Sequence, residues 1–460
     1  MCGIAGYMGS GNAISIITSI LLELQHRGQE AAGIAVATRD GSIHRVVGKG
    51  LVVEALSYEN LYLLYNLDGI VGGIGHVRYS TSGGYLDSQA QPIVVGDNSL
   101  KIAVAFNGTI ANYASLAKAF GFGNVNGDAK LLSMLLYRLA KELGNDVVEA
   151  LKILPMYVVG GYSIAVLTSE PRVVVAKDPH GFRPLSISFA NNELYIASET
   201  AALEIASPYP WREVLPGEII SFDGRSLEQT KSPISRFVSP CVFEYVYFSR
   251  PDSVFNGVNI YVSRVRMGEE LAKEVPTNGD VVIPVPDSGR AAAIGFSKVS
   301  GIPIEEGIVV NKYVGRGFIA PPTMRDFISR FKYGFVKDVV NGKRIVLVDD
   351  SIVRGTTMRN IVRRLREIGA REVHVRVASP PFRYPCFMGI DVASRDELIA
   401  WRLMDLDDIA RAIEADSVGY NSVQGLRKAV GIPLLCYACF TGLYPFRGLD
   451  VDALEKSFVR

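Results

Sequence analysis

Two patterns of hydrophobic and polar residues divide the chain near residue 235. In the first part, short β-type runs separated by glycines alternate with helical stretches, which predicts a layered α/β architecture. In the second part, apolar strands alternate with amphipathic helices, the pattern of a doubly wound parallel sheet. Examples from the first part are β-type runs at residues 33–37, 102–106 and 173–176 and helical stretches near residues 13–24 and 130–143.

The clearest local unit lies at residues 344–377. Residues 344–348 form a short β-branched apolar run, as expected of a strand buried on both faces. The following helix carries its apolar residues at a 3.6-residue period, and Gly369 is placed to end it. In the next strand, valines alternate with His374 and Arg376, so one face of that strand should be less buried. In a βαβ unit of this kind, function is expected at the loop after the first strand.

Length and composition indicate a folded protein of more than one domain. A chain of 460 residues predicts two or three domains, and 48 % hydrophobic with 21 % charged residues is the balance of a globular protein. The net charge of +1 gives no reason to expect nucleic acid or a membrane surface as partner. The longest uncharged run starts at Ile153 and is interrupted by Pro155, so no membrane span is predicted. The first residues also lack a basic signal-peptide lead, and we expect a cytoplasmic protein.

The five cysteines fall into one near the amino terminus and four others. An odd number in a chain expected in the cytosol argues for metal-binding or catalytic roles rather than disulfides. Cys2 follows Met1, and removal of Met1 would leave a thiol on a residue whose free α-amine can act as its general base. A cysteine at the second position also occurs by chance, so the other motifs of the sequence must show whether Cys2 is catalytic.

Several further motifs accompany Cys2 in a fixed order. They are CGIAG at residues 2–6, LQHRGQEAAG at 24–33, HVRYST at 76–81, FNG at 106–108, Asp128, DPHGFRPL at 178–185, ASE at 197–199 and PGE at 216–218. Together they resemble the glutaminase domain of the amino-terminal-nucleophile amidotransferases, and the match covers most of residues 2–220. The resemblance implies an αββα sandwich as the glutaminase domain, over residues 2–235.

The same resemblance implies how this domain cleaves glutamine. Cys2 would attack the side-chain carbonyl of glutamine, and negative charge would develop on the carbonyl oxygen. The side-chain amide of Asn107 and the backbone N–H of Gly108 would donate hydrogen bonds to that oxygen. These three residues are the predicted catalytic set.

Four more residues are expected to bind glutamine or to order the site. Arg78 would hold the α-carboxylate with two parallel hydrogen bonds, and Asp128 would hold the α-ammonium group. Arg27 is expected to order the site. His76 is expected to support the loop that carries Arg78.

A second set of motifs lies on the predicted βαβ unit. The sequence VDDSIVRGTT at residues 348–357 follows the apolar strand and opens the helix. An acidic pair alone could simply be solvated, but backbone N–H groups at a helix start favour a phosphate. The motif resembles the phosphoribosyl pyrophosphate (PRPP) site of type I phosphoribosyltransferases. The PRPP contacts that this resemblance implies are Asp349, Asp350, Ser351, Arg354, Gly355, Thr356 and Thr357.

Another loop, PDSGR at residues 286–290, also follows an apolar strand. The resemblance places one Mg²⁺ per subunit at Ser288, Asp349 and Asp350, where it would neutralise the leaving pyrophosphate. Residues 311–319 resemble the mobile flap of the family. Candidate phosphate contacts, which could equally be solvated surface charges, are Arg316, Arg325 and Lys332.

The remaining cysteines, Cys241, Cys386, Cys436 and Cys439, form a candidate metal site. The last two are spaced so that one metal centre can take both, and spacing alone permits zinc or an iron–sulfur cluster. The surrounding segments resemble the iron–sulfur-containing, Bacillus-type branch of the glutamine PRPP amidotransferase family. That resemblance implies one 4Fe-4S cluster per subunit, with the structural role of joining distant segments of the chain.

Membership of that family would imply two coupled reactions. The glutaminase domain releases ammonia from glutamine, and a transferase domain over residues 236–460 adds it to PRPP. The products are 5-phosphoribosylamine, glutamate and pyrophosphate, at the first step of de novo purine synthesis. Feedback inhibition by purine nucleotides and a homotetramer are implied as well.

Two alternatives compete with this hypothesis. A glutaminase of this class could serve glucosamine-phosphate or asparagine synthesis, although those relatives carry other second domains than the one indicated by residues 348–357. The chain could also be a catalytically silent regulator that senses PRPP. The joint presence of Cys2, Arg78, Asn107 and Gly108 argues against a sensor that has lost catalysis.

Overall fold

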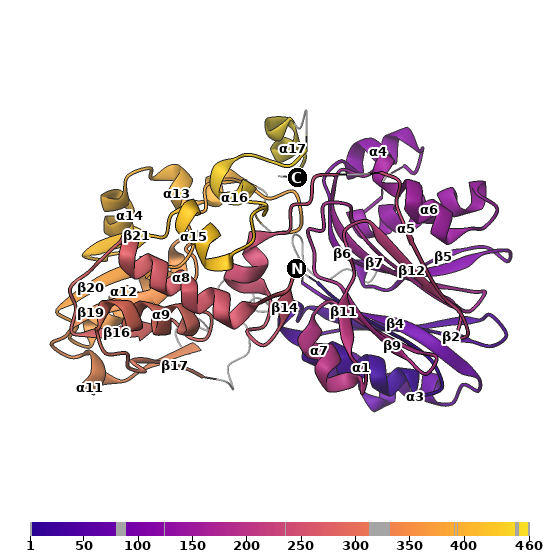
Figure 1. Cartoon of the computed structure of the whole chain (residues 1–460), viewed down its shortest axis with the longest axis horizontal. Helices are drawn as coiled ribbons and strands as arrows, with labels where there is room; N and C mark the ends of the chain where they lie inside the picture. The colour runs from indigo at the N-terminus through magenta and orange to yellow at the C-terminus, as the bar shows by residue number, and fades with distance from the viewer. Residues whose placement is uncertain are drawn as a thin grey trace.

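The computed structural model describes residues 2–79, 89–123, 125–234, 236–311, 332–390, 392, 394–446 and 450–458. Within them the chain forms two lobes (Figure 1). The amino-terminal lobe contains two stacked antiparallel sheets, and the carboxyl-terminal lobe contains a parallel sheet covered by helices.

The two antiparallel sheets come from the first half of the chain. In spatial order the first sheet contains β11 (Trp211–Glu213), β9 (Ser186–Ala190), β10 (Glu193–Ala197), β1 (Gly3–Met8), β4 (Ile70–Arg78), β2 (Ala31–Thr38) and β3 (Ile43–Lys49). The second contains β13 (Leu227–Lys231), β12 (Glu218–Phe222), β8 (Arg172–Lys177), β7 (Gly160–Thr168), β6 (Lys101–Ile110) and β5 (Ile93–Gly96). The β-type runs predicted at 33–37, 102–106 and 173–176 all lie inside strands.

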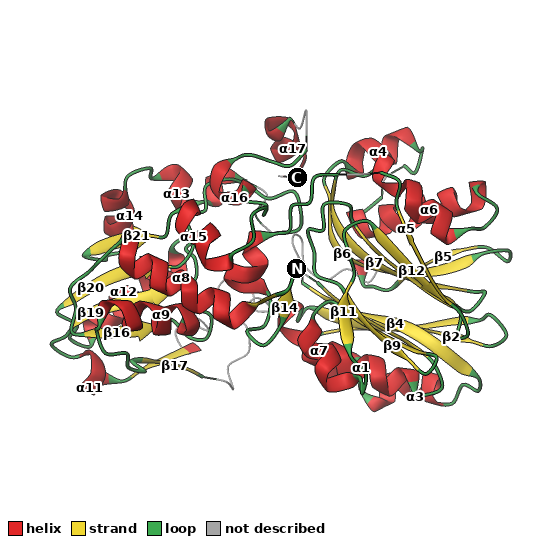
Figure 2. Cartoon of the chain, in the orientation of Figure 1, coloured by secondary structure: helices red, strands yellow, loops and turns green. Residues whose placement is uncertain are grey.

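Helices cover the outer faces of both sheets (Figure 2). Those on the first sheet are α1 (Ala13–Glu23), α2 (Val52–Ala55), α3 (Tyr58–Tyr65) and α7 (Thr200–Ala206), and those on the second are α4 (Tyr113–Ala119), α5 (Asp128–Glu142) and α6 (Val147–Ile153). Between the sheets, Ile4, Ile74 and Val175 belong to one buried apolar cluster. The arrangement is therefore the predicted αββα sandwich.

The second lobe is built on four parallel strands. In spatial order these are β16 (Val281–Pro284), β19 (Arg344–Asp349), β20 (Glu372–Val377) and β21 (Ser417–Tyr420). Along β19, Val346 packs into one apolar core and Leu347 into the other, because successive side chains of a strand point to opposite faces. The helices α8 (Ile260–Glu274), α9 (Arg290–Ser300) and α15 (Val423–Val430) cover the first face, and α12 (Thr356–Glu367) and α14 (Leu406–Ala412) cover the second.

The predicted βαβ unit is thus β19–α12–β20, but one detail of the prediction was wrong. Arg376 was expected on a less buried face of its strand, and it is only 5 % exposed. Its Nε donates to Thr277 Oγ1 at 2.5 Å and its Nη1 to Ser417 Oγ at 3.1 Å. These acceptors, in the loop before β16 and on the neighbouring strand, satisfy the guanidinium and allow it to be buried. His374 is half-buried, as expected.

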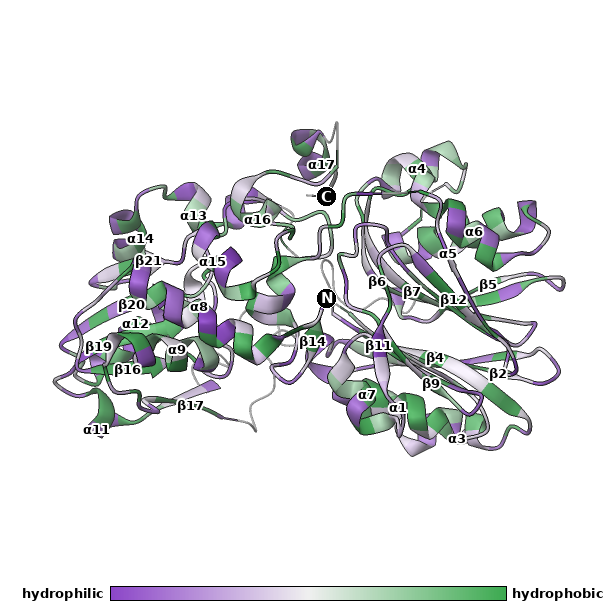
Figure 3. Ribbon diagram, viewed as in Figure 1, coloured by the Kyte–Doolittle hydropathy of each residue, from purple (hydrophilic) through white to green (hydrophobic). Residues whose placement is uncertain are grey.

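Short elements complete the described chain. They are three 3-10 turns (Gln25–Arg27, Leu154–Met156 and Arg395–Glu397), a π-helical turn (Glu244–Phe248), β14 (Val254–Phe255), β15 (Val258–Asn259), β17 (Ile308–Val310), β18 (Tyr333–Phe335), α11 (Lys337–Val340), α13 (Ile399–Arg402), α16 (Ala438–Thr441) and α17 (Val451–Phe458). In Figure 3 the helices of both lobes carry hydrophobic and hydrophilic stretches side by side, as amphipathic helices do. Among the described helices, none has the length and apolar character needed to cross a bilayer.

Segments from both halves of the sequence meet where the lobes join. Phe182 from the first lobe and Phe387 from the second share one small apolar cluster. Phe446, from the carboxyl-terminal segment, lies 4.7 Å from the ring of His180 and 6.0 Å from that of Phe182, measured between ring centroids. The carboxyl-terminal segment therefore packs on the amino-terminal lobe, and Figure 1 shows α16 and α17 beside this junction.

Candidate active sites

Cys2 lies at the end of the first sheet, directly before β1. Because Gly3 pairs with Val77 and Ile4 with His76, the register brings Cys2 beside the end of β4. The half-buried Cys2 is held by its backbone at two points: its nitrogen donates to Asn107 Oδ1 at 3.2 Å, and its carbonyl oxygen accepts from Arg27 Nε at 2.9 Å.

The thiol of Cys2 is more acidic than an ordinary cysteine. Burial alone would raise its pKa, but the nearby imidazole of His76, through its charge and hydrogen bonding, helps to lower the pKa to about 6. His76 is fully buried, and its Nε2 donates to the carbonyl of Phe106 at 3.1 Å. His76 therefore acts on the Cys2 thiol itself, in addition to lying two residues before Arg78.

Asn107 and Gly108 lie together on β6, next to the nucleophile. Asn107 is fully buried, and its Nδ2 group has no hydrogen-bond partner among the described residues. At Gly108, a Cβ atom would come within 1.9 Å of the Gly161 carbonyl oxygen on β7, so only glycine fits. An amide N–H₂ group that is buried, fixed and unpaired is what an oxyanion site requires.

The predicted glutamine-binding residues lie around the same strand ends. Arg78 is 9 % exposed, its Nη2 donates to Gln89 Oε1, and its Nε lies 3.8 Å from Glu30 Oε2. Its Nη1 has no partner among the described residues. Asp128 is the first residue of α5, and its Oδ2 accepts from the Ile110 N–H at 3.1 Å.

Arg78 and Asp128 also act on each other electrostatically. Burial raises the pKa of Asp128, while the positive charge of Arg78 opposes that shift. One cation and one anion that act on each other in this way match the two charges of an α-amino acid. The structure therefore brings together the predicted set Cys2, Arg27, His76, Arg78, Asn107, Gly108 and Asp128.

In the second lobe, two loops meet at the carboxyl ends of β16 and β19. The Val285 N–H donates to the Val348 carbonyl at 2.8 Å. A Cβ atom on Gly289 would come within 2.5 Å of the same carbonyl oxygen, so the loops approach this closely only because residue 289 is glycine. The contact places Ser288 beside Asp350, to whose carboxylate its hydroxyl donates.

Asp349 and Asp350 are both buried, with exposures of 8 % and 6 %. Burial, followed by the neighbouring Asp350 charge, raises the pKa of Asp349 well above its ordinary range. Burial likewise raises the pKa of Asp350, although the hydroxyls of Ser288 and Ser351 oppose the shift. Burial and mutual repulsion make it unfavourable for both carboxyls to be charged. A cation bound between them would stabilise the charged form of both.

The loop after Asp350 leads into the start of α12. Gly355 is the residue before the first helical turn and has φ of 83°, a conformation that favours glycine. Thr356 and Thr357 are exposed in that first turn, where free backbone N–H groups point outward. The Nε of Arg354 donates to Glu397 Oε2 at 2.7 Å, and the predicted contact of Arg354 with PRPP stays a prediction.

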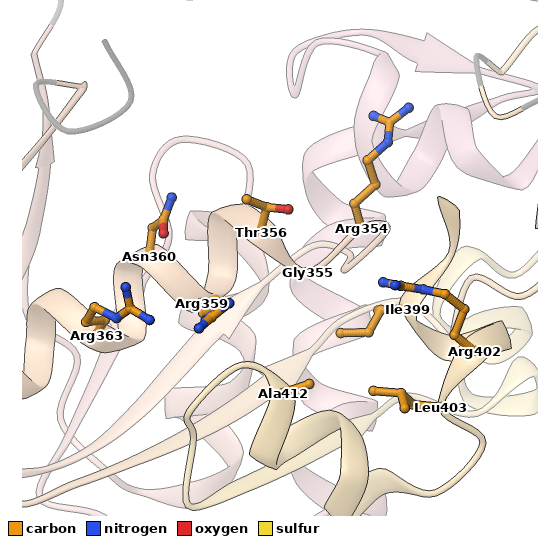
Figure 4. A pocket seen from close by; sticks show the side chains of 10 residues that line it. All are labelled: Arg354, Gly355, Thr356, Arg359, Asn360, Arg363, Ile399, Arg402, Leu403 and Ala412. Atoms are coloured by element: carbon orange, nitrogen blue, oxygen red, sulfur yellow. The ribbon is translucent and has the colours of Figure 1, made fainter. Parts of the chain in front are cut away.

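A depression of about 340 Å³ lies on the outer side of this loop (Figure 4). It is lined by Arg354, Gly355, Thr356, Arg359, Asn360, Arg363, Ile399, Arg402, Leu403 and Ala412. The lining does not include Asp349, Asp350 or Ser288. Three of its arginines pair with Glu397 or Glu414. The depression is therefore distinct from the acidic pair.

Most of the predicted flap lies outside the described residues. Residues 312–331, including Arg316 and Arg325, lie outside the described residues. Lys332 follows them, and its ammonium group lies 4.9 Å from the centroid of the Tyr333 ring. The charge of Lys332 lowers the otherwise raised pKa of Asp349, so the lysine lies on the side of the acidic pair.

The four remaining cysteines come together at the junction of the lobes. Cys241 and Cys436 pair as a parallel β-bridge, and the Met388 N–H donates to Cys386 Sγ at 3.4 Å. Burial, then the charges of Cys241, Cys386 and Cys436, raise the pKa of Cys439. No three Cys, His, Asp or Glu side chains of the described chain converge closely enough to hold a single metal ion.

Buried charged residues that the sequence did not single out connect these sites. Arg183, Glu199 and Glu244 are all 2 % exposed or less. Each lies inside a motif that carried the family resemblance or beside a cysteine, but their mutual contacts span large sequence separations. No local spacing pattern could have paired them.

Comparison with known proteins identifies relatives of both lobes. Residues 76–205 match the glutamine amidotransferase domain family, and residues 265–379 match the phosphoribosyl transferase domain family. The amidophosphoribosyltransferase of Pyrococcus horikoshii is 46 % identical over 454 residues, covering 98 % of this chain and 97 % of that protein. The amidophosphoribosyltransferase of Bacillus subtilis is 40 % identical, covering 96 % of this chain and 94 % of that protein.

A solved structure shares the whole fold. Glutamine PRPP amidotransferase from B. subtilis, complexed with ADP and GMP, superposes with a TM-score of 0.87 at 38 % sequence identity. The superposition covers 98 % of this chain and 99 % of that chain. Both lobes and their mutual arrangement are therefore similar in the two proteins.

Proposed function

Because this chain belongs to the amidophosphoribosyltransferase family, we propose that Cys2 takes ammonia from glutamine and that the Asp349–Asp350 site adds it to PRPP. The products are 5-phosphoribosylamine, glutamate and pyrophosphate, at the entry to purine synthesis. The observation that carries the assignment of residues is the bond between the Cys2 nitrogen and Asn107, whose Nδ2 group stays buried and unpaired.

The glutaminase step follows from the surroundings of Cys2. On removal of Met1, the nitrogen bonded to Asn107 becomes an α-amine that can carry protons to and from the reacting groups. The Cys2 thiolate attacks the glutamine side-chain carbonyl, and Asn107 Nδ2 and the Gly108 N–H stabilise the oxyanion. The tetrahedral intermediate expels ammonia and leaves a γ-glutamyl thioester, which water hydrolyses to glutamate and free thiol.

Arg78 and Asp128 select glutamine by its two α-substituents. The buried, unpaired Nη1 of Arg78 is a ready donor for the α-carboxylate, and Asp128 is an acceptor for the α-ammonium group. An amide without an α-carboxylate would leave the buried Arg78 Nη1 without a partner, which costs free energy and gives specificity.

The transfer step takes place at the second lobe. The 5-phosphate would bind at the start of α12. Its hydrogen-bond donors would be backbone N–H groups, including that of Gly355, and the hydroxyls of Ser351, Thr356 and Thr357. Asp349 and Asp350 bind the ribose hydroxyls. Ammonia then attacks C1 of the ribose, and the bond from C1 to pyrophosphate breaks. Lys332 remains a phosphate contact in this proposal, whereas Arg354 would first have to leave Glu397.

The acidic pair also fits a Mg²⁺ ion. The donors are all oxygen atoms, from Asp349, Asp350 and Ser288, and the two carboxyls lie buried together. Mg²⁺ is commonly held by one or two carboxylates together with substrate phosphates. When bound, it would neutralise charge on the leaving pyrophosphate.

The four remaining cysteines are proposed to hold an iron–sulfur cluster. Their thiols lie near enough to one another that the charges of Cys241, Cys386 and Cys436 help to raise the pKa of Cys439, whose largest cause is burial. Four thiolates are a donor set for zinc as well as for a 4Fe-4S cluster, and the resemblance of the surrounding segments to the Bacillus-type branch favours the cluster. It would join the interlobe segment, the transferase core and the carboxyl-terminal segment.

Regulation, assembly and location complete the proposal. The relative from B. subtilis was solved with ADP and GMP, which supports purine nucleotides as feedback inhibitors of this chain. The homotetramer and the domain limits 2–235 and 236–460 stay predictions. The cytoplasmic location stays a prediction as well. The alternatives of a silent PRPP sensor or of another glutamine-dependent synthase are not supported by the relatives.

The proposal is tested by measuring PRPP-dependent release of glutamate and pyrophosphate from anaerobically purified protein. The comparison is Cys2→Ala with ammonia supplied in place of glutamine. We expect Cys2→Ala to lose the glutamine reaction and to keep the ammonia reaction. If the wild-type protein releases no pyrophosphate with either nitrogen source, the assignment of the transfer reaction is wrong.

A further inference from the structure

Three buried charged residues, Arg27, Glu244 and Arg183, form a continuous series of contacts from Cys2 to the loop that carries Cys386. Arg27 donates through Nε to the Cys2 carbonyl at 2.9 Å. Its Nη2 donates to Glu244 Oε1 at 3.0 Å, and its Nη1 to Glu244 Oε2 at 3.1 Å. Two hydrogen bonds to Glu244 therefore fix the Arg27 guanidinium, while its Nε holds the Cys2 carbonyl.

The same carboxylate holds a second arginine. Arg183 Nη1 donates to Glu244 Oε1 at 3.2 Å. Arg183 Nε then donates to the Met388 carbonyl at 2.9 Å, and Nη2 donates to the same oxygen. Met388 lies two residues after Cys386, so Glu244 touches one arginine that holds the nucleophile and one that holds the cysteine loop.

The three side chains of this contact series are held in place by burial and by hydrogen bonds. The side chains of Arg27, Arg183 and Glu244 are all fully buried. Burial alone would raise the pKa of Glu244, but Arg27 and Arg183 hold it below its ordinary value, so the carboxylate is charged at neutral pH. Glu199 shares Arg27, and Ser249 Oγ donates to Glu244 Oε2 at 2.8 Å, so every oxygen of Glu244 is occupied.

The cysteine loop is packed tightly against Arg183. A Cβ atom on Gly389 would lie 2.5 Å from Arg183 Nη2 and 2.8 Å from its Nε. The backbone there has φ of 118°, which also favours glycine. A shift of this loop must therefore move the guanidinium of Arg183, and through it Glu244.

We propose that Glu244 is a positioning residue for the Cys2 nucleophile and that it ties the position of Cys2 to the loop bearing Cys386. Glu244 acts through Arg27 on one side and through Arg183 on the other, and it does not touch glutamine. Disturbing either side should misplace Cys2 and slow the cleavage of glutamine, while the PRPP site keeps its own geometry. The inference rests on the proposed function only in its choice of assay.

The first test is Glu244→Gln, which keeps the shape and removes the charge. We expect the ratio of glutamine-dependent to ammonia-dependent pyrophosphate release to fall at least tenfold. The fall should appear in kcat, with KM for glutamine and for PRPP within twofold of wild type, because the substrate contacts are untouched. The alkylation rate of Cys2 by iodoacetamide, followed by mass spectrometry of its peptide, should change at least threefold.

Glu218→Gln is the matched control. Glu218 is a buried glutamate whose Oε1 accepts from Arg212 Nη2 at 2.8 Å, and its contacts do not include Arg27 or Arg183. The ratio should stay within twofold of wild type in this variant. An unchanged ratio in Glu244→Gln, or an equal fall in Glu218→Gln, would overturn the proposal. A wild-type protein without the glutamine reaction would instead overturn the proposed function.

A second pair of variants tests the link to the cysteine loop and does not depend on folding of Glu244→Gln. Gly389→Ala crowds Arg183, whereas Gly301→Ala places a Cβ at a similarly left-handed position, φ of 72°, with nothing within 4 Å. We expect Gly389→Ala to lower the glutamine-to-ammonia ratio at least threefold and to change the Cys2 alkylation rate. If Gly389→Ala matches Gly301→Ala in both readouts, the link from the cysteine loop to Cys2 is wrong.

Discussion

The backbone nitrogen of Cys2 donates to Oδ1 of Asn107, and this single contact gives Asn107 two functions. Its oxygen fixes the group that becomes the α-amine of the processed chain. Its Nδ2 group, buried and unpaired within the described residues, is left free for the oxyanion of the substrate. In the proposed mechanism, one side chain would thus set the distance between the base and the stabilised charge.

Replacing Asn107 should therefore slow the chemistry more than the binding. For Asn107→Ala we expect kcat of the glutamine reaction to fall by about 10²–10³-fold, the usual effect of losing one oxyanion donor. KM for glutamine and the ammonia-dependent rate should change little in steady-state assays. Asn112→Ala is the control, because the Asn112 side chain hydrogen-bonds to the backbone of Tyr157 and Val159. A raised KM with unchanged kcat would contradict the oxyanion role.

The pKa of about 6 for the Cys2 thiol predicts the pH dependence of its reactivity. A lowered pKa means that the thiolate is present above pH 6 and is lost as the pH falls through that value. The rate of Cys2 alkylation by iodoacetamide should therefore reach half its maximum near pH 6. An ordinary thiol would reach it near pH 8.5.

His76→Gln should move that midpoint upward, because it removes a nearby charge that lowers the pKa. His44→Gln, on β3 of the same sheet, should leave the midpoint at its wild-type value. A midpoint that does not move in His76→Gln would show that another group sets the acidity of the thiol.

Gly289 determines how closely the two PRPP loops approach. In Gly289→Ala the new Cβ would lie 2.5 Å from the Val348 carbonyl and 2.8 Å from that of Val285, both rigid backbone atoms. We expect KM for PRPP to rise at least tenfold with either nitrogen source and stability to fall by about 1–3 kcal/mol. Gly334→Ala is the control, since its Cβ would meet nothing closer than 3.8 Å. Normal PRPP kinetics in Gly289→Ala would contradict the proposed arrangement of the loops.

The cysteine site predicts the metal content of the protein. Anaerobically purified protein should contain about four iron and four sulfide per chain by colorimetric assay. Cys386→Ser should lose most of this iron and melt at a lower temperature, because three segments are no longer joined. Cys2→Ser should keep the iron. One zinc per chain in place of iron would contradict the cluster.

Much of the fold and of the site follows from the sequence, because local patterns encode it. The apolar run of β19, the loop after Asp350 and the helix with Met358 and Leu365 appear as predicted, since period and turn chemistry are local properties. The side chains around Cys2 could be named because they lie in recognisable motifs.

The contacts between distant residues could not be predicted in the same way. Glu244 meets Arg27 across 217 positions, and nothing in the sequence near either residue reports that contact. Arg354 likewise donates to Glu397, which is 43 positions away. Pairing of buried charges is decided by how the lobes pack, so it appears only when the chain is folded.

The packing of Phe446 on His180 and Phe182 also has a consequence for synthesis on the ribosome. The strands around Cys2 emerge first, yet the aromatic cover over His180 and the cysteine pair of residues 436–439 emerge near the end of translation. A nascent chain can therefore form the sheets of the first lobe while its junction with the second lobe is still open. The junction between the lobes is therefore completed only at the end of translation, after the sheets around Cys2 have been made.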